Sequence, residues 1–516
     1  MSPRRTRAAG PLPAPAERTF LGHPRWFGTL FIVDMWERFS FYGLLAILYL
    51  YLVAPAAEGG MGMTTGDAAG LFGIYMSLVF MSALPGGWVA DRILGARRAT
   101  LYGGVLIAAG HACMAVPVPV SLYPGLGLII AGSGLVKPSM AAMIGQMYRG
   151  RPERREAAFS VFYVSIQVSA LFAPLATGYA AERIDWHLGF GIAAAGMALG
   201  LLHYVLGMRH LGDVGRHPAD PLSPEEGRRA LRRTLLWGGT PAAAATAAVA
   251  TGLVGFDRVL MAVGLAVVCV PAAYYTSLLR RSGLAAAERT RLRAFVWMLI
   301  ASAVFWMLYA QGPALLNLFA LDSVRRSLLG FVVPASWFQS VQPLFLLLLA
   351  PVFAALWVRL GARMSAPAKF TGGLLLGGLS FALMALAATA AETGPVSPLW
   401  LLGVYLLIVC GELAIAPVGL SLAAEVAPTG RSGQILGLFW LFAAVGAAVG
   451  GQLARLAEAI PESGYHLVLA AAGLATAVAL GAAARALGTR LAAGTAGGPD
   501  PDAPAARPDT RPAAAS

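Results

Sequence analysis

Lysine, cysteine and histidine are all scarce in this chain. Two of its 516 residues are lysine, three are cysteine and seven are histidine. The cysteines stand apart from one another in apolar runs, which excludes a disulfide framework and a zinc spacing, so we expect small buried hydrophobic residues there. No two histidines stand at ligand spacing either. The sequence therefore predicts no bound metal and no cofactor.

Charged residues are sparse as well. They make up 12% of the chain, about half the share of a soluble domain, whereas 58% of the residues are hydrophobic and the mean hydropathy is +0.69. A helix crosses a bilayer with about 20 mostly apolar residues, and its backbone polar groups must be paired within the chain. We therefore expect an all-α membrane protein. Its predicted spans, about 14 in number, are residues 27–53, 69–90, 98–118, 122–147, 157–181, 187–208, 231–254, 258–279, 292–316, 332–360, 367–390, 397–423, 433–456 and 464–487.

The positive charge is concentrated on alternate loops. The net charge is +13, and basic clusters recur at residues 4–7, 92–98, 149–155, 228–233 and 280–293. The intervening loops are short or mixed in charge, except that residues 322–326 include Arg325 and Arg326. Because basic residues collect on the cytoplasmic side of a membrane, we expect a multi-pass protein of the cell membrane with both termini in the cytoplasm. The same placement favours the lipid bilayer, and no nucleic acid, as a partner.

The predicted spans group as six, then two, then six. Two six-helix halves around a cavity are the layout of the major facilitator superfamily. A loop with Gly87, Asp91, Arg92 and Arg97 follows the second span and is typical of that superfamily. We predict a disordered cytoplasmic tail at 1–24, a first bundle at 25–209, a linker with two extra helices at 210–290, a second bundle at 291–488 and a second disordered tail at 489–516.

Five ionisable residues interrupt the apolar runs, and they are the candidates for chemistry. Asp34, Glu37 and Arg38 lie in the predicted span 27–53, Lys137 in 122–147 and Glu412 in 397–423. Charge at this depth is costly, and it usually marks a substrate, ion or proton path. A structural ion pair on the first span and a lysine that reaches the membrane surface are the alternative interpretations. The pattern favours a transporter.

The residues around these charges resemble a known family. Glu37-Arg38-Phe39-Ser40 with Tyr42-Gly43 resembles the signature of the proton-dependent oligopeptide transporter (POT/PTR) family of the major facilitator superfamily. Gly134 to Pro138, Phe305-Trp306 and Gly411-Glu412-Leu413 match other blocks of that family, and the likeness runs from about residue 24 to residue 487. The resemblance implies two six-helix bundles with two inserted helices, and proton-coupled import of di- and tripeptides by alternating access.

The resemblance also implies roles for single residues. Arg38 and Lys137 would hold the carboxylate end of a peptide, Glu412 its amino end, and Lys137 would pair with Glu412 as an outer gate. Protons, the coupling ion, would be carried through Asp34, Glu37 and Arg38. Tyr42 and Trp306 would line the pocket, together with five positions where this chain departs from the family: Phe80, Gln167, Ala310, Gln342 and Phe439. Ala310 is the largest departure, because it replaces a carboxylate.

Three functions fit these residues. The first is proton-coupled symport of di- or tripeptides, or of modified peptide-like substrates, by a protein that functions as a monomer. The second is export or weakly coupled facilitated diffusion of a peptide-like natural product, which the loss of a proton site at Ala310 would permit. The third is a membrane sensor that binds peptides without moving them. An enzyme is not expected, since the sequence has no zinc-protease spacing, nucleophile elbow or phosphate loop.

Overall fold

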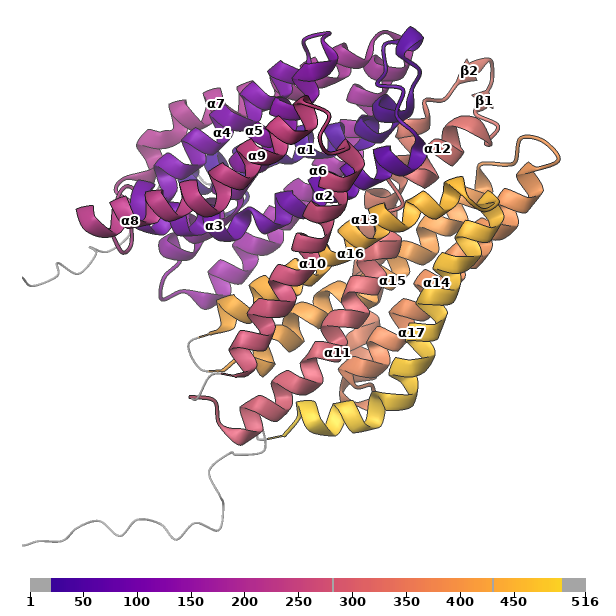
Figure 1. Cartoon of the computed structure of the whole chain (residues 1–516). Helices are drawn as coiled ribbons and strands as arrows, with labels where there is room; N and C mark the ends of the chain where they lie inside the picture. Colours follow the sequence, from indigo (N-terminus) through magenta and orange to yellow (C-terminus); the bar gives the residue numbers. More distant parts are fainter. Residues whose placement is uncertain (1–19, 281–282, 429–430, 494–516) are drawn as a thin grey trace, which may run out of the picture.

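The computed structural model describes residues 20–280, 283–428 and 431–493, and the chain over these residues is almost entirely helical (Figure 1). The parts of the predicted tails at 1–19 and 494–516 lie outside the described residues. The first bundle contains α1 (Arg25–Val53), α2 (Thr65–Met81), α3 (Ala83–Val89), α4 (Ala96–Met114), α5 (Leu122–Met147), α6 (Pro152–Arg183) and α7 (Trp186–Gly207), with the short turns η1 (Ala56–Glu58), η2 (Ala90–Leu94), η3 (Pro119–Ser121) and η4 (Met208–Leu211).

Local capping explains where several of these helices begin. The Thr64 side chain accepts a hydrogen bond from the Asp67 amide at the start of α2. Asp185 does the same for the amides of His187 and Leu188 at the start of α7. These caps satisfy amides that have no partner inside their own helix. Gly95, between η2 and α4, has a φ of 78°, a conformation that glycine adopts without strain.

The rest of the chain forms an insert and a second bundle. The insert has α8 (Pro224–Thr234), η5 (Leu235–Gly239), α9 (Thr240–Ala250) and α10 (Phe256–Leu279). The second bundle has α11 (Ala286–Tyr309), α12 (Leu315–Asp322), η6 (Ala335–Ser340), α13 (Val341–Leu360), η7 (Gly361–Arg363), α14 (Ala366–Ala391), α15 (Leu399–Val426), α16 (Ser432–Leu453), η8 (Ala454–Glu458) and α17 (Glu462–Leu491). A small antiparallel hairpin that the sequence did not predict, β1 (Ser327–Leu328) and β2 (Phe331–Val332), precedes η6.

The helices confirm an all-α membrane protein. Among the described residues, 11 helices are long and apolar enough to cross a membrane. The three other predicted spans are also helical: α1 contains the charged residues, α4 begins with arginines, and residues 231–254 contain the short apolar helix α9. The predicted span 292–316 was too long. It ends at Tyr309 rather than near residue 316, because Gly312 and Pro313 follow in a turn.

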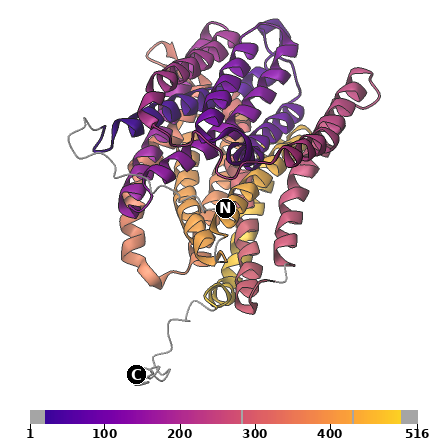
Figure 2. The same cartoon turned by 90° about the vertical axis from the view of Figure 1, so that its left-hand side faces the viewer.

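The two bundles meet along α2 and α16. Figures 1 and 2 show the indigo-to-magenta first bundle stacked on the orange-to-yellow second bundle, with the inserted helices along one side. A Cβ on Gly73 would lie 2.7 Å from the Ala447 carbonyl oxygen, and one on Gly451 would lie 2.5 Å from that of Ala69. Glycine thus lets the two helices touch backbone to backbone. One apolar core cluster extends across this junction.

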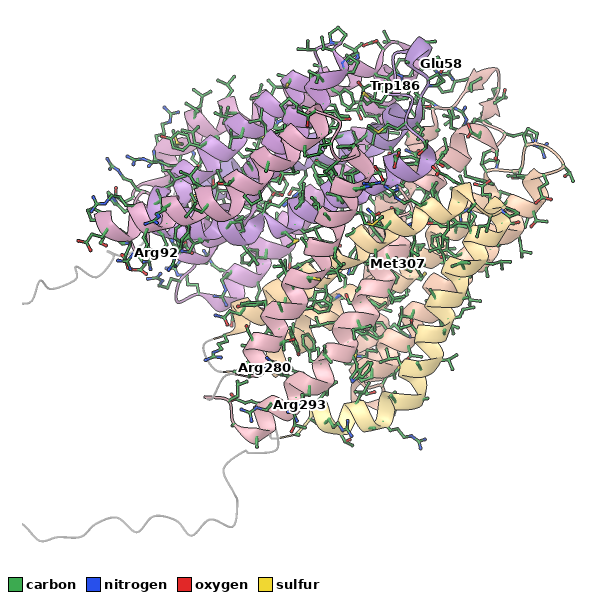
Figure 3. The ribbon with its side chains drawn as sticks, in the orientation of Figure 1. Glu58, Arg92, Trp186, Arg280, Arg293 and Met307 are labelled. Atoms are coloured by element: carbon green, nitrogen blue, oxygen red, sulfur yellow. The ribbon has the colours of Figure 1, made fainter. Side chains whose placement is uncertain are left out.

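The molecule has two chemically different ends. Figure 3 shows Arg92, Arg280 and Arg293 at one end, called here the arginine-rich end, and Glu58 and Trp186 at the opposite end, called the Glu58 end. The basic loops therefore gather on one side of the molecule, as alternate placement along the chain predicted. Because Trp186 donates a hydrogen bond to the Glu58 carbonyl oxygen, the loops of the Glu58 end are also packed on one another.

Candidate functional site

The charged residues of α1 form a buried cluster. Asp34 and Glu37 are each 1% exposed, and Arg38 Nε lies 3.5 Å from Asp34 Oδ1 and 3.3 Å from Glu37 Oε2. Asp34 and Arg38 meet because residues four apart share one face of a helix. Ser165 of α6 donates a hydrogen bond of 2.7 Å to Asp34 Oδ2. Within the described residues, Arg38 Nε and Glu37 Oε2 meet as an ion pair and not in hydrogen-bond geometry.

Lys137 lies beside this cluster but is held by aromatic rings. Its Nζ is 4.5 Å from the centre of the Phe41 ring and 5.4 Å from that of Phe80. Such cation–π contacts stabilise a cation without a carboxylate. Lys137 also lies in the electrostatic field of Arg38. No ion pair between Lys137 and Glu412 is found in the described part of the chain, so the outer gate pair stays a prediction.

Glycine positions Lys137 in this place. A Cβ on Gly134 of α5 would lie 2.5 Å from the Ser82 carbonyl oxygen, and one on Gly86 of α3 would lie 2.0 Å from that of Gly134. The backbones of α3 and α5 therefore touch just before Lys137. Pro138 follows inside α5 and removes one donor from the helix ladder.

Glu412 lies near tyrosines from both bundles. The carboxyl group of Glu412, on α15, interacts electrostatically with the phenols of Tyr42, Tyr163 and Tyr309. These phenols come from α1, α6 and α11 respectively. Tyr163 was not among the predicted site residues. Its spacing from Gln167, which was predicted, is one helical turn on α6, and that spacing is the signal that could have identified it.

An aromatic wall connects the two bundles at this level. The rings of Phe80 and Trp440 are almost parallel, with an interplanar angle of 3° and centres 6.1 Å apart. Trp306 lies 5.9 Å from Trp440 and 4.9 Å from Tyr309, measured between ring centres. Phe439, the predicted pocket residue, is 0% exposed and packs on Gly419 of α15. The structure therefore favours Trp440 over Phe439 as the α16 residue of this wall.

The end of α11 is electrically neutral. Ala310 is 8% exposed and forms the C-cap of the helix. Gln311 donates a hydrogen bond to the Met307 carbonyl oxygen and accepts one of 3.0 Å from the Tyr465 hydroxyl. Gln342 lies beside Gly312 and is buried, as is Gln167 in the other bundle. Among the described residues 309–314 of this turn, none carries a charge that could replace the carboxylate that the family resemblance implies at Ala310.

Comparison with known proteins places the chain in a family. The sequence pattern of the POT family matches residues 97–473. This chain belongs to the POT family. It is 39% identical over 452 residues to the uncharacterized transporter YclF of Bacillus subtilis, covering 87% of this chain and 91% of the relative. It is 33% identical over 486 residues to the di-/tripeptide transporter of Lactococcus lactis subsp. cremoris, covering 90% and 96%.

Solved structures agree with this assignment. A crystal structure of the peptide transporter POT in complex with sulfate has a TM-score of 0.88 to this chain at 38% identity, covering 92% of this chain and 97% of that chain. The fold, the multi-pass membrane location and the transporter class predicted from the sequence are thus confirmed. The roles of the individual site residues stay predictions.

The superfamily loop of this POT-family chain holds the segment that follows the first bundle. Arg92 pairs with Asp220 and lies 3.8 Å from Glu226, while Arg97 Nη1 donates a hydrogen bond to the Gly212 carbonyl oxygen. Gly87 packs against Pro138. The backbone amide of Asp220 donates to the Asp91 carbonyl oxygen. Residues 208–222, which include the start of the linker predicted at 210–290, are therefore a strap bound across the loop.

Two carboxylates close the Glu58 end of this POT-family chain. Glu182 of α6 accepts hydrogen bonds from the amides of Ala335 (2.7 Å) and Ser336 (2.8 Å) and from the Ser336 hydroxyl, and it lies 3.7 Å from Arg326. In the reverse direction, Glu458 of the second bundle accepts a hydrogen bond of 2.6 Å from the Gly66 amide at the start of α2. Each bundle thus caps a helix of the other. We call these the Glu182 contact and the Glu458 contact.

The polar contacts between the bundles extend from the Glu58 end to the middle of the molecule. Asn317 donates to the Ala46 carbonyl oxygen, and Ser77 donates to that of Ala444. The interbundle hydrogen bonds and ion pairs described above lie at the Glu58 end and in the middle of the molecule. The described contacts therefore close the molecule at the Glu58 end.

Proposed function

We propose that this protein is a proton-coupled symporter of di- or tripeptides, or of peptide-like substrates, in the cell membrane. The observation that carries the proposal is the buried cluster on α1, in which Arg38 Nε lies within 3.5 Å of two carboxylates, those of Asp34 and Glu37. The relative from Lactococcus lactis is named a di-/tripeptide transporter, which supports the same substrate class. Protons act as the coupling ion, and the chain works as a monomer.

A zwitterionic substrate matches the charges of the site. Arg38 and Lys137, on the first bundle, provide cations for a peptide carboxylate, and a guanidinium binds a carboxylate in a two-pronged geometry. Glu412, on the second bundle, provides an anion for the amino group. A peptide therefore bridges the two bundles through its ends. The intervening aromatic wall of Phe80, Trp306 and Trp440 contacts the middle of the substrate.

Proton coupling follows from competition for Arg38. Asp34 and Glu37 both lie within 3.5 Å of Arg38 Nε, so an ionised carboxylate on α1 competes with the substrate carboxylate for the guanidinium. When a proton neutralises one of them, Arg38 becomes available to the substrate. Proton uptake and peptide binding then favour each other, as linkage requires. Because Ala310 carries no proton, the coupling in this chain rests on α1.

Alternating access requires that the site open first at one end of the molecule and then at the other. We assign the arginine-rich end to the cytoplasm, which places both termini there. The structure then corresponds to an inward-facing state, closed toward the outside by the Glu182 contact and the Glu458 contact. Both contacts must break before the site can open outward, and new contacts must form at the arginine-rich end.

The test is uptake of labelled dialanine into proteoliposomes with and without an inward proton gradient. Accumulation that needs the gradient is the expected result. Arg38→Gln should abolish it while the protein stays folded, and Arg228→Gln, which removes an exposed arginine of α8, should leave it unchanged. Uptake by Arg38→Gln at the wild-type rate would contradict the proposal.

A second function is favoured by one observation, the neutral end of α11 at Ala310. A missing proton site permits weakly coupled facilitated diffusion or export of a peptide-like compound. The same assay separates the two functions. Equilibration of dialanine that is equally fast with and without the gradient would identify a facilitator.

A further inference from the structure

The arginine-rich end contains a second site, distinct from the cluster on α1. It is a cavity of about 390 Å³ at the start of α4, against the strap that follows the first bundle. Three of its lining side chains are arginines, one is tyrosine and two are apolar: Arg97, Arg98, Arg216, Tyr102, Leu101 and Met208. Nothing in the peptide path described above uses this cavity.

The arginines are held in place by backbone contacts. The Arg97 amide donates a hydrogen bond of 2.8 Å to the Gly215 carbonyl oxygen, and Arg97 Nη1 donates one of 2.9 Å to that of Gly212. The Tyr204 hydroxyl donates to the Arg97 carbonyl oxygen. Because Gly215 is followed directly by Arg216, these bonds fix Arg216 next to the first turn of α4. The cavity is therefore formed before any ligand arrives.

The lining residues carry more positive charge than their neighbours neutralise. Arg216 lies 3.3 Å from Asp213, and both side chains are exposed. The Arg98 side chain makes no hydrogen bond or ion pair with any described residue. Guanidinium groups gathered in one cavity repel one another, and a phosphate relieves that repulsion because its oxygens accept paired N–H donors. The polar part of the site thus fits a phosphate group.

The apolar surface next to the cavity identifies the rest of the ligand. Tyr102, which lines the cavity, is 48% exposed, and Val105 is exposed one turn further along α4. Leu202, Val205 and Leu206 are exposed on α7, which packs against α4. Exposed apolar side chains on membrane-spanning helices face acyl chains, and tyrosine is enriched at the headgroup level. A phosphate beside such a surface is the chemistry of a phospholipid.

We infer that this cavity binds the headgroup of an anionic phospholipid from the leaflet at the arginine-rich end. The lipid phosphate lies on Arg98 and Arg216, and an acyl chain runs along the exposed faces of α4 and α7. Basic pockets between transmembrane helices are suited to such headgroups. A bound lipid also bridges α4 and the strap, and so stabilises the fold of the superfamily loop. This inference does not depend on which substrate is transported.

The test is native mass spectrometry of the purified, delipidated full-length protein titrated with phosphatidylglycerol or with phosphatidylcholine of the same acyl chains. Phosphatidylglycerol should remain bound at lower concentrations than phosphatidylcholine. The double variant Arg98→Gln/Arg216→Gln should weaken phosphatidylglycerol binding by about tenfold or more, since it removes two charge-assisted contacts. It should leave phosphatidylcholine binding unchanged.

A matched control variant distinguishes binding in this cavity from nonspecific attraction to surface charge. Arg228→Gln/Arg229→Gln removes the same charge from exposed positions of α8 outside the cavity and should bind phosphatidylglycerol like the wild type. An equal loss in both double variants would overturn the inference, as would full binding by Arg98→Gln/Arg216→Gln. Competition by inorganic phosphate at the concentration where phosphatidylglycerol binds would overturn the lipid assignment and identify a free-phosphate site. Arg98→Lys keeps the positive charge but loses the paired N–H donors of the guanidinium, so it should bind phosphatidylglycerol with intermediate affinity.

Discussion

Arg38 is shared between two buried carboxylates and, in the proposed cycle, a substrate carboxylate. Its geometry matters as much as its charge, because only a guanidinium offers a planar pair of N–H donors. We predict that Arg38→Lys, which keeps the charge, lowers dialanine uptake by about ten- to hundredfold, the loss of one charge-assisted hydrogen bond or two. Initial rates in proteoliposomes measure this loss. Arg228→Lys is the matched control and should transport normally. Equal rates for Arg38→Lys and the wild type would show that transport does not use the paired N–H donors of the guanidinium.

Ala310 is the residue at which this chain departs most from the family pattern. A glutamate here would lie at the buried C-cap of α11, next to Tyr309. We predict that Ala310→Glu makes uptake depend more steeply on pH, because it adds a group that must gain or lose a proton during transport. The measurement is the uptake rate as a function of external pH at a fixed gradient, with Ala310→Gln as the uncharged control. If both variants give the wild-type profile, coupling does not involve this position.

His23 links the pH of the solution to stability at the arginine-rich end. Its ring nitrogen contacts the Tyr148 hydroxyl, and burial, aided by the positive charge of Arg154, lowers the pKa of His23 below its ordinary value of 6.5. Burial also raises the pKa of Tyr148 to about 12, so the phenol stays protonated and donates to the neutral imidazole. The unfolded chain therefore binds this proton more readily than the folded protein.

The lowered pKa of His23 makes the folded protein less stable at acidic pH. As the pH falls below about 6.5, His23 is protonated first in the unfolded chain, and the free energy of unfolding decreases. We predict that the apparent melting temperature drops between pH 7 and pH 5, and that the drop is smaller in His23→Asn. Thermal unfolding at both values checks this, and an identical drop in wild type and variant would remove His23 as a contributor.

At the scale of elements, α2 and α16 touch backbone to backbone where the bundles meet. A methyl group on Gly73 would lie 2.7 Å from a backbone oxygen that cannot move without its helix. We predict that Gly73→Ala lowers stability by about 1–3 kcal/mol through overpacking. Gly127→Ala is the matched control, because its Cβ would meet nothing within 4 Å, and it should stabilise α5 by about 0.5–1 kcal/mol. Thermal unfolding of both variants in detergent provides the comparison, and a neutral Gly73→Ala would show that the helices can separate at little cost.

The elements also show what could be predicted from the sequence. Apolar length predicted the membrane helices well, since a bilayer imposes one length on every span. It did not show that α11 ends at Tyr309, although Gly312 and Pro313 shortly after that residue are a sequence signal for a turn. Nor could it show that residues 208–222 form a bound strap, since hydrogen bonds such as Arg97 to Gly212 join segments far apart in the chain.

At the site, the charged residues were identified because charge in an apolar run is conspicuous. Ser165 and Tyr163 were missed as site residues, and Phe439 was chosen over Trp440, because the contacts with Asp34, Glu412 and Phe80 depend on how helices cross. The adjacent pair Phe439 and Trp440 illustrates the limit. Neighbouring residues on a helix point about 100° apart, and only the rotation of α16 decides which one faces Phe80.

At the scale of the whole molecule, the Glu182 contact joins the two bundles at the Glu58 end. Glu182→Gln keeps the size of the side chain but loses its charge for Arg326 and turns a donor toward the amides of Ala335 and Ser336. We predict that it increases the population that is open at this end. Distances between spin labels at Glu58→Cys and Leu399→Cys, with the native cysteines replaced, should gain a longer component. Glu392→Gln, an exposed change in the same bundle, is the control and should leave the distribution unchanged. An unchanged distribution in Glu182→Gln would assign closure to the apolar contacts.

The Glu182 contact has a further consequence for how such a protein changes over generations. Two of its donors are backbone amides, and any residue except proline supplies one. Substitutions at Ala335 can therefore accumulate without a compensating change in the opposite bundle, provided that they fit the space. The contact requires the carboxylate side chain of Glu182, whereas the backbone amides of Ala335 and Ser336 do not depend on which side chains those positions carry. That asymmetry leaves one half of the molecule free to diversify while the other half keeps the same closed state.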